Sequence, residues 1–524
     1  MMIRRFNSTL INITLGLAVA LITTGFLRLQ LLTGPPDTDS GFYIFLSQFT
    51  YSLLSNGINM PDKMPFALYP LITSWVWALE VQQWIAFRII DLLVAVIASF
   101  LLFKVILKES GSTIFTIALS FPLLLALNSP EYIGYGFKNS IWIAYIPLFS
   151  ALLLWQNLTK DSHLAFYFIG ALAALGVLFR EAFLVFFIIG AIAIWVTYGW
   201  KTLIRYLIGA AILGFTITGI ILYLRNWDAM ALISSYTDIQ KKTYDISAEA
   251  IKKLFYKSGL SSAKDFTLIL TTSLITFIYA IKLFINKKIS LRRPLFWLSL
   301  ALVALVEPYI KMGFPYHFAA CIPGLAGLSA LGWKYVSIEQ TSEKYKYLKV
   351  AISFISIFFI YPVLSSALKK EPIYSITDAY NLSQSQLFRE TKSVKSSNHL
   401  IASKIIFENS REDSTLSITG QMEALFPLTG LLPPAYIAAD LRNVLSFVDF
   451  DETLFKEKIK EYQPTLIMAV EPTIYVFGSL RGEAEISRLI EETNLYEKIA
   501  IIPFNSDIHY GWKHGSIYRL KSFN

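Results

Sequence analysis

Two aspartates, Asp37 and Asp39, directly follow the first long apolar stretch of the chain. Carboxylates beside apolar segments are costly to desolvate, so their presence there indicates a functional role. A carboxylate in such a place can act as a general base toward a sugar hydroxyl or help to hold a divalent cation. The alternative is that the aspartates cap a helix starting at Ser40, because Asp and Ser accept hydrogen bonds from free N–H groups at a helix start.

Cationic residues occur in three further loops. Lys63 stands in the same loop as the aspartates, and Lys311 follows a later apolar run. Arg180 stands beside Glu181 and interrupts an apolar stretch, so that the two residues mark the tip of a helical hairpin. A cation at such a place can bind a phosphate. Two alternatives stay open: Lys63 as a snorkelling surface lysine, and Arg180 in a structural pair with Glu181.

A third group consists of Glu307, Tyr316 and His317, which surround Lys311 in the sequence. Ionisable groups at the mouth of a membrane helix bundle are functional candidates by default. A lone histidine on an apolar face is more often a hydrogen-bonding residue than a metal ligand. We therefore expect this group to belong to a binding site without a metal.

Other catalytic schemes lack their residues in this sequence. It contains no Gly-x-Ser-x-Gly elbow, no His-Glu-x-x-His zinc helix and no Walker loop. Cys321 is the one cysteine, which excludes a disulfide or a thiolate metal cluster within one chain. An ATPase or a zinc protease is therefore not indicated.

The composition shows which solvent surrounds these residues. The chain has 524 residues, of which 55% are hydrophobic, 15% aromatic and only 16% charged, whereas soluble domains are about one-quarter charged. The net charge of +9 comes from Lys and Arg residues that fall mainly in short loops between apolar runs, so it indicates membrane topology and not nucleic-acid binding.

Because a span needs about 20 apolar residues, the sequence predicts about eleven transmembrane helices. Arg88 and Asp91 lie three residues apart inside the second of them, on one face, where we expect an ion pair that holds helices together. The predicted spans are residues 9–31, 83–107, 112–128, 140–156, 163–179, 182–199, 205–224, 265–286, 294–310, 315–335 and 347–367.

The positive-inside rule places the Lys- and Arg-rich loops in the cytoplasm, so the long loops and the C-terminal part face outward. In the outer loop 32–82, the aromatic segments 42–54 and 66–79 are predicted to be helices in the membrane interface. Residues 225–264 are predicted to form a polar loop with an amphipathic helix around 248–255, which could act as a lid.

The composition becomes that of a soluble protein after residue 367. Short β-rich runs alternate there with helical patterns, which predicts a small extracytoplasmic α/β domain over residues 368–524. The predicted strands are 415–419, 465–470, 499–503 and 516–520, and the predicted helices are 452–461 and 484–493. The fold class is therefore an α-helical polytopic membrane protein, residues 1–367, with a C-terminal α/β domain.

Several local motifs resemble the GT-C superfamily of membrane glycosyltransferases, in particular its branch of protein O-mannosyltransferases and the lipid A aminoarabinose transferase. The first outer loop of bacterial members reads roughly Asp-Ser-Gly-x-Phe, then Gly, then Asp-x-x-x-Lys-x-Pro, and here residues 39–43, Gly57 and residues 63–65 are similar to it. The phrase Pro-Tyr-His-Phe at 315–318, with Ile-Pro at 322–323, resembles a second family motif.

The resemblance implies a reaction and roles for the candidate residues. The donor would be a sugar on polyprenyl phosphate, and transfer to a glycan, lipid or protein acceptor would proceed with inversion at the anomeric carbon. Asp39 matches the catalytic acidic position and would be the base, supported by Asp37. Lys63, Arg180 and Lys311 would bind the donor phosphate. No cofactor is required, although a divalent cation at the two aspartates is compatible with the chemistry. The expected location is a bacterial inner or plasma membrane, with the site on the extracytoplasmic face.

Two other classes of function remain. A transporter or flippase of a lipid-linked saccharide would also be polytopic, but the sequence shows no two-half repeat and no paired Gly/Pro-broken spans. A non-catalytic envelope assembly protein would use the C-terminal domain to bind a partner. Both alternatives leave Asp39 dispensable for sugar transfer.

Overall fold

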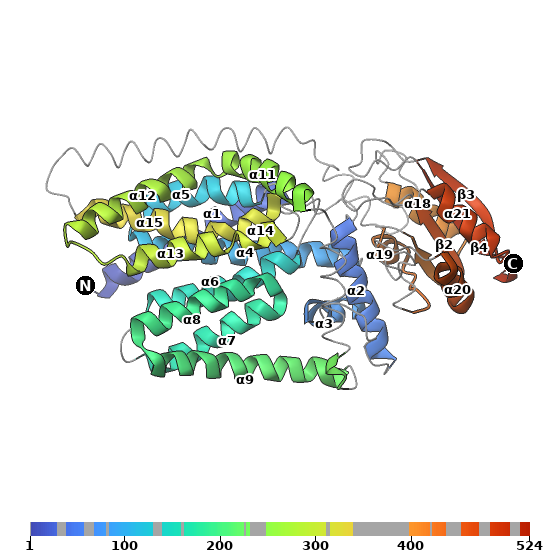
Figure 1. Cartoon of the computed structure of the whole chain (residues 1–524), viewed down its shortest axis with the longest axis horizontal. Helices are drawn as coiled ribbons and strands as arrows, with labels where there is room; N and C mark the ends of the chain where they lie inside the picture. Colours follow the sequence, from blue (N-terminus) through green and yellow to red (C-terminus); the bar gives the residue numbers. More distant parts are fainter. Residues whose placement is uncertain are drawn as a thin grey trace.

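A computed structural model of the chain shows a helical bundle joined to a small sheet with helices (Figure 1). The structure describes residues 2–28, 38–56, 68–79, 83–128, 139–158, 162–224, 227–230, 248–310, 315–338, 398–419, 422–435, 452–470, 483–503 and 514–523.

Each of the first ten predicted spans coincides with helical structure, while the eleventh, 347–367, lies outside the described residues. The helices of the bundle are α1 (Met2–Arg28), α4 (Gln83–Ser110), α5 (Thr113–Leu127), α6 (Asn139–Gln156), α7 (His163–Phe179), α8 (Leu184–Tyr198), α9 (Trp200–Leu224), α12 (Thr267–Ile285), α13 (Arg292–Val303), α14 (Val306–Ile310) and α15 (Ile322–Ile338).

The prediction of one continuous helix over 294–310 is wrong, because α13 ends at Val303 and α14 begins at Val306. Pro308 explains the interruption. It has no N–H to donate to the carbonyl of Ala304, four residues earlier, and its ring clashes there. The Ala304 carbonyl instead accepts from the Glu307 N–H at 3.2 Å, which is a tighter turn. The chain then re-enters the bundle through a 3₁₀ helix, η4 (Pro315–Cys321), ahead of α15.

Four helical segments among the described residues are long and apolar enough to cross a membrane: Ala86–Ser110, Glu181–Tyr198, Trp200–Leu224 and Thr267–Ile285. Four shorter apolar helices, Leu10–Gly25, Thr113–Leu127, Trp142–Gln156 and His163–Phe179, accompany them. Large apolar side chains on α9 and α12 are exposed, for example Phe215 at 77% and Leu274 at 62%. Lipid is the solvent that suits such faces, so the protein is a membrane protein.

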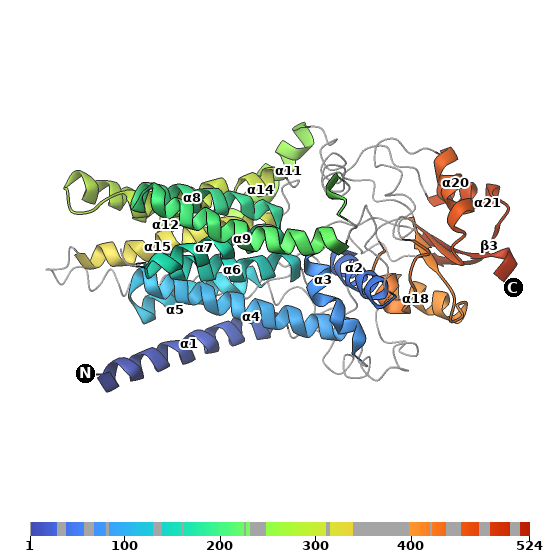
Figure 2. The ribbon, with the colours of Figure 1, turned by 90° about the horizontal axis from the view of Figure 1, so that it is seen from below.

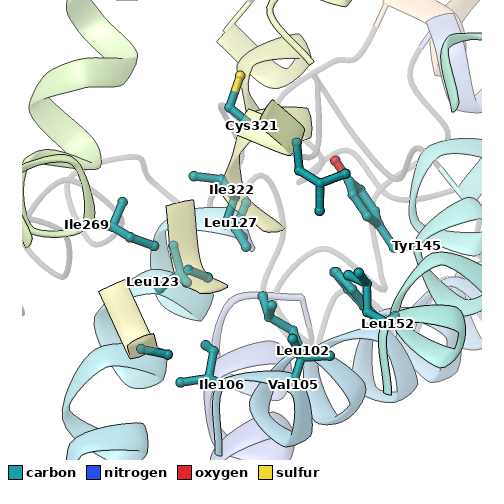
Figure 3. Close-up of a cluster of buried hydrophobic side chains, with 14 of the residues drawn as sticks. Leu102, Val105, Ile106, Leu123, Leu127, Tyr145, Leu152, Ile269, Cys321 and Ile322 are labelled. Atoms are coloured by element: carbon teal, nitrogen blue, oxygen red, sulfur yellow. The ribbon is translucent and has the colours of Figure 1, made fainter. Parts of the chain in front are cut away.

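The bundle core forms where α4, α5, α6, α12 and α15 meet. Figure 3 shows its central side chains, with Leu102 and Ile106 from α4 lying near Leu123 from α5. At the other side of the bundle, α7 and α9 cross in very close contact. A Cβ atom placed on Gly209 would lie 2.0 Å from the Tyr167 carbonyl oxygen, so only glycine fits there.

The loops that are predicted to face outward contain three helical segments within the described residues. They are α2 (Thr38–Ser55), α3 (Leu68–Thr73) with the 3₁₀ helix η2 (Ser74–Ala78), and α11 (Ala248–Asp265). Helices are therefore confirmed at the segments 42–54 and 66–79 and around 248–255. The apolar residues of α2 are buried by protein, because residues 44–50 are all buried. Figures 1 and 2 place α2 at the junction of the bundle and the sheet.

The C-terminal residues form a four-stranded mixed sheet in the order β1-β2-β4-β3. Strands β1 and β2 are parallel, and β4 pairs antiparallel with both β2 and β3. The predicted strands and helices are all present. The elements are α18 (Asn398–Glu408), β1 (Leu416–Ile418), α19 (Leu425–Thr429), α20 (Glu452–Tyr462), β2 (Leu466–Val470), α21 (Glu483–Glu492), β3 (Tyr496–Pro503), β4 (His514–Leu520) and η8 (Lys521–Phe523).

Strand β2 shows how the sheet divides two cores. Side chains alternate across a strand, and Leu466 and Met468 pack with α18, α19 and α2. Ile467 and Ala469 face the opposite side, where they pack with α20 and α21. The first of these cores therefore joins the sheet to the outer helix α2.

Candidate functional site

Arg180 stands where α7 ends and the short 3₁₀ helix η3 (Glu181–Phe183) begins. Its backbone is extended, with φ −153°, and its N–H closes α7 by donating to the Gly176 carbonyl at 3.0 Å. The residue is only 7% exposed. The hairpin tip predicted at this residue therefore points its guanidinium into protein, where a buried charge requires a partner.

Glu307 of α14 is that partner. One Glu307 carboxylate oxygen accepts a hydrogen bond from a terminal nitrogen of Arg180, and the two side chains are 4% and 8% exposed. The main ion-pair partner of Arg180 is therefore Glu307 and not Glu181, as one alternative had it. The charge of Glu181 also acts on Arg180. Burial alone lowers the pKa of the Arg180 guanidinium, but the Glu307 carboxylate outweighs burial and raises it.

His317 of η4 completes the cluster. Its Nδ1 lies 2.9 Å from the Glu307 Oε1 and 3.2 Å from the Arg180 Nη2. Since a carboxylate can only accept, we assign the hydrogen to Nδ1, which donates to Glu307. The Arg180 Nε, in contrast, is buried and has no hydrogen-bond partner in the described part of the chain. An arginine Nε–H is a donor of the kind from which anionic groups accept.

Three aromatic residues surround this cluster. The Tyr316 ring lies 4.2 Å from the His317 ring, centroid to centroid, and Tyr145 of α6 is within range of the charges of Glu307 and Arg180. Tyr43 of α2 is a further neighbour of Arg180. Of the predicted residues, the structure therefore brings together Arg180, Glu307, Tyr316 and His317, and it adds Tyr43 and Tyr145.

Tyr43 matters because it connects this cluster to the acidic motif. Asp39 is the second residue of α2 and precedes Tyr43 by about one helical turn. The capping alternative expected a helix that begins at Ser40, but α2 begins at Thr38, so Asp39 lies inside the first turn. Asp37, Lys63 and Lys311 lie outside the described residues.

A second buried ionic cluster was not foreseen from the sequence. Arg28, the last residue of α1, is fully buried and pairs with Asp91 of α4. Its Nε donates to the Asn128 Oδ1 at 2.7 Å, and its guanidinium lies 5.1 Å from the Trp142 ring centroid. The charge of Arg88, for which a pairing with Asp91 was predicted, also acts on Asp91, so Arg28 joins this site as a partner that the sequence did not indicate.

The described residues contain no group of three or more His, Cys, Asp and Glu side chains that could hold a metal ion. Glu307 and His317 would supply only two ligands, and the adjacent Arg180 charge opposes a second cation there. A divalent cation at Asp37 and Asp39 stays a prediction.

Comparisons with known proteins find likeness among solved structures. No family model and no curated protein matches the chain. Among solved structures, an oligosaccharyltransferase from Archaeoglobus fulgidus, solved in complex with zinc and sulfate, is similar with a TM-score of 0.43 and 11% identity. The match covers 87% of this chain and 67% of that one. At this TM-score and identity the likeness assigns no activity, so the function must be argued from the chain's own residues.

Proposed function

We propose that this protein is a membrane glycosyltransferase of the GT-C type that moves a sugar from a polyprenyl-phosphate donor to an extracytoplasmic glycan, lipid or protein. The observation that carries the proposal is the buried Arg180, which Glu307 holds in place and whose Nε has no hydrogen-bond partner among the described residues. Asp39, the proposed base, lies in the first turn of α2. A base and a phosphate-binding cation are the two groups that such a transfer needs.

The proposed step is a direct displacement. The acceptor hydroxyl oxygen forms a bond to the anomeric carbon while the bond from that carbon to the phosphate oxygen breaks, and the phosphate leaves with the bonding electrons. Asp39 accepts the hydroxyl proton, with Asp37 in support. Arg180, together with Lys63 and Lys311, stabilises the charge that develops on the leaving phosphate. No cofactor takes part in this scheme.

Glu307 and His317 would keep Arg180 ready for this role. An arginine side chain has many rotamers, and binding becomes more costly when they must be frozen by the ligand. Here Glu307 fixes one terminal nitrogen, so the guanidinium is oriented before the donor arrives. The Nε without a partner among the described residues is the donor that we assign to a phosphate oxygen.

The orientation of the protein is part of the proposal. A reporter fused after Lys370 should report from outside the cytoplasm, and a reporter fused after Lys288 should report from inside. If both results were reversed, the acidic loop would face cytoplasmic nucleotide sugars and the lipid-donor assignment would be wrong.

The base is tested by Asp39→Asn, which keeps the size of the side chain. Turnover should fall by at least about a hundredfold, which is typical of a lost general base, while donor binding is retained. Normal transfer by this variant would remove Asp39 from the mechanism. It would favour a flippase or an assembly protein, since both leave Asp39 dispensable.

A further inference from the structure

One face of α2 contacts both ends of α19, a short helix of the C-terminal part. The contacts come from Gly41, Phe45 and Gln48. Their spacing of four and three residues places them on a single helical face. Helices α2 and α19 therefore lie side by side along the full length of α19.

The contact at Gly41 is the tightest of the three. A Cβ atom placed on Gly41 would lie 2.5 Å from the Ala424 Cα and 2.6 Å from its backbone nitrogen. Cβ atoms do not approach backbone this closely, so α2 reaches α19 only because residue 41 is a glycine. Gly41 is the second residue after Asp39 in the chain.

The other two contacts lie further along both helices. The rings of Phe45 and Phe426 stack with centroids 4.3 Å apart, and both side chains are buried. At the far end of α19, the Gln48 Nε2 donates to the carbonyl of Gly430 at 3.2 Å. Gly430 ends α19 in the left-handed conformation, with φ 77°.

The neighbouring face of α2 packs on the membrane part. Tyr43 meets Tyr69 of α3 edge-on at 5.7 Å between centroids, and the Thr73 hydroxyl donates to the Ser47 hydroxyl at 3.2 Å. Helix α2 thus packs against α3 of the membrane part on one face and against α19 on the neighbouring face.

We infer that the C-terminal α/β part positions the catalytic carboxylate, because its helix α19 fixes the place of α2 and therefore of Asp39. The inference rests on the proposed function. It makes α19 a positioning element and not only an outer cap or an acceptor-binding surface. A displacement of a reacting group by about 1 Å can cost on the order of a hundredfold in rate. Loosening α19 should accordingly lower kcat without much change in substrate affinity.

The test compares two glycine variants of the full-length protein. Gly41→Ala introduces the clash with Ala424, whereas Gly214→Ala on α9 places a methyl group where no atom lies within 4 Å. We expect Gly41→Ala to lower kcat by about tenfold or more, with the KM values for donor and acceptor within about twofold of wild type. Gly214→Ala should match the wild type in all three values.

A second arm uses the stacked rings, in case Gly41→Ala folds poorly. Phe45→Ala and Phe426→Ala should each lower kcat, and the double variant should fall by clearly less than the product of the two effects, because each change breaks the same contact. Phe426→Leu keeps apolar volume and should restore most of kcat. If the contact served overall stability alone, kcat per folded molecule would stay at the wild-type value in these variants.

Hydrogen exchange provides a readout that does not depend on activity. Gly41→Ala should speed amide exchange in residues 38–55 and 422–430, with the bundle helix α12 unchanged. An unchanged kcat in Gly41→Ala and in the Phe variants, or an increase in acceptor KM alone, would overturn the inference. If wild-type protein transfers no sugar, the proposed function fails along with the catalytic role of the contact. The exchange data then still decide whether α19 orders α2.

Discussion

Replacing Glu307 by Gln should destabilise the protein, because it leaves the Arg180 guanidinium buried without a compensating charge. Both side chains are less than one-tenth exposed, so water cannot replace the lost partner. Removing one partner of a buried ion pair costs about 3–5 kcal/mol. The glutamine oxygen can still accept a hydrogen bond from Arg180, so we expect the lower end, about 3 kcal/mol. At roughly 2 °C per kcal/mol for a large chain, the unfolding midpoint should fall by about 6 °C.

The measurement is thermal unfolding of purified protein in detergent, followed by the fluorescence of the 11 tryptophans at one fixed scan rate. Glu408→Gln provides a matched control, because Glu408 pairs with Lys404 at 3.9 Å while both side chains are about half exposed. Exposed pairs contribute about 0–1 kcal/mol, so the control should shift the midpoint by less than about 2 °C.

A double-mutant cycle separates the pair from other effects of each change. Arg180→Met leaves Glu307 beside His317, which can take up a proton and compensate the carboxylate at 2.9 Å. Arg180→Met should therefore destabilise less than Glu307→Gln, and the double variant should cost less than the sum of the two. A Glu307→Gln midpoint within about 1 °C of wild type, or strict additivity in the cycle, would refute a buried, energetically coupled pair.

Two further predictions concern the bundle. Gly209→Ala should lower the unfolding midpoint by an amount equivalent to about 1–3 kcal/mol, since its methyl group would meet the Tyr167 carbonyl oxygen, while Gly214→Ala on the same helix should be neutral or slightly stabilising. Equal midpoints for the two variants would contradict the close crossing of α7 and α9. Arg28→Met should be strongly destabilising in the same assay, and a second change, Asp91→Asn, should recover part of the loss. An undiminished loss in the double variant would argue against their pairing.

The regular elements were predictable because local sequence patterns determine them. The β-rich run at 465–470 became β2, and the first ten apolar runs became helical. The error at 294–310 came from counting apolar residues without weighing Pro308, whose missing N–H interrupts the helix. A proline alone did not mark the break, because Pro122 and Pro147 lie inside the continuous helices α5 and α6.

The pairing of charges was not predictable from the sequence. Arg180 and Glu307 are 127 positions apart, and Arg28 and Asp91 are 63 apart. Sequence spacing indicated only local partners, Glu181 as one alternative for Arg180 and Arg88 for Asp91. Tertiary packing decides between such choices, because a buried charge selects whichever partner the fold brings within reach. The lone arginine in the last turn of an apolar helix was the available signal for Arg28.

The role of α2 shows the same limit on a larger scale. Its aromatic residues predicted a helix in the membrane interface. The sequence could not distinguish lipid from protein as the neighbour, because apolar faces that meet either have the same composition. Only the structure shows that Phe45 meets Phe426, which lies 381 positions later in the chain.

The central claim is tested most directly by the choice of sugar donor. Purified protein in detergent should transfer sugar from polyprenyl monophosphate sugars and give no product with nucleotide sugars. Lys63→Met should weaken donor use more than acceptor use, because a cation bound to the phosphate stabilises both the donor complex and the leaving group. Transfer from nucleotide sugars, with full activity retained by Lys63→Met and Asp39→Asn, would contradict the account.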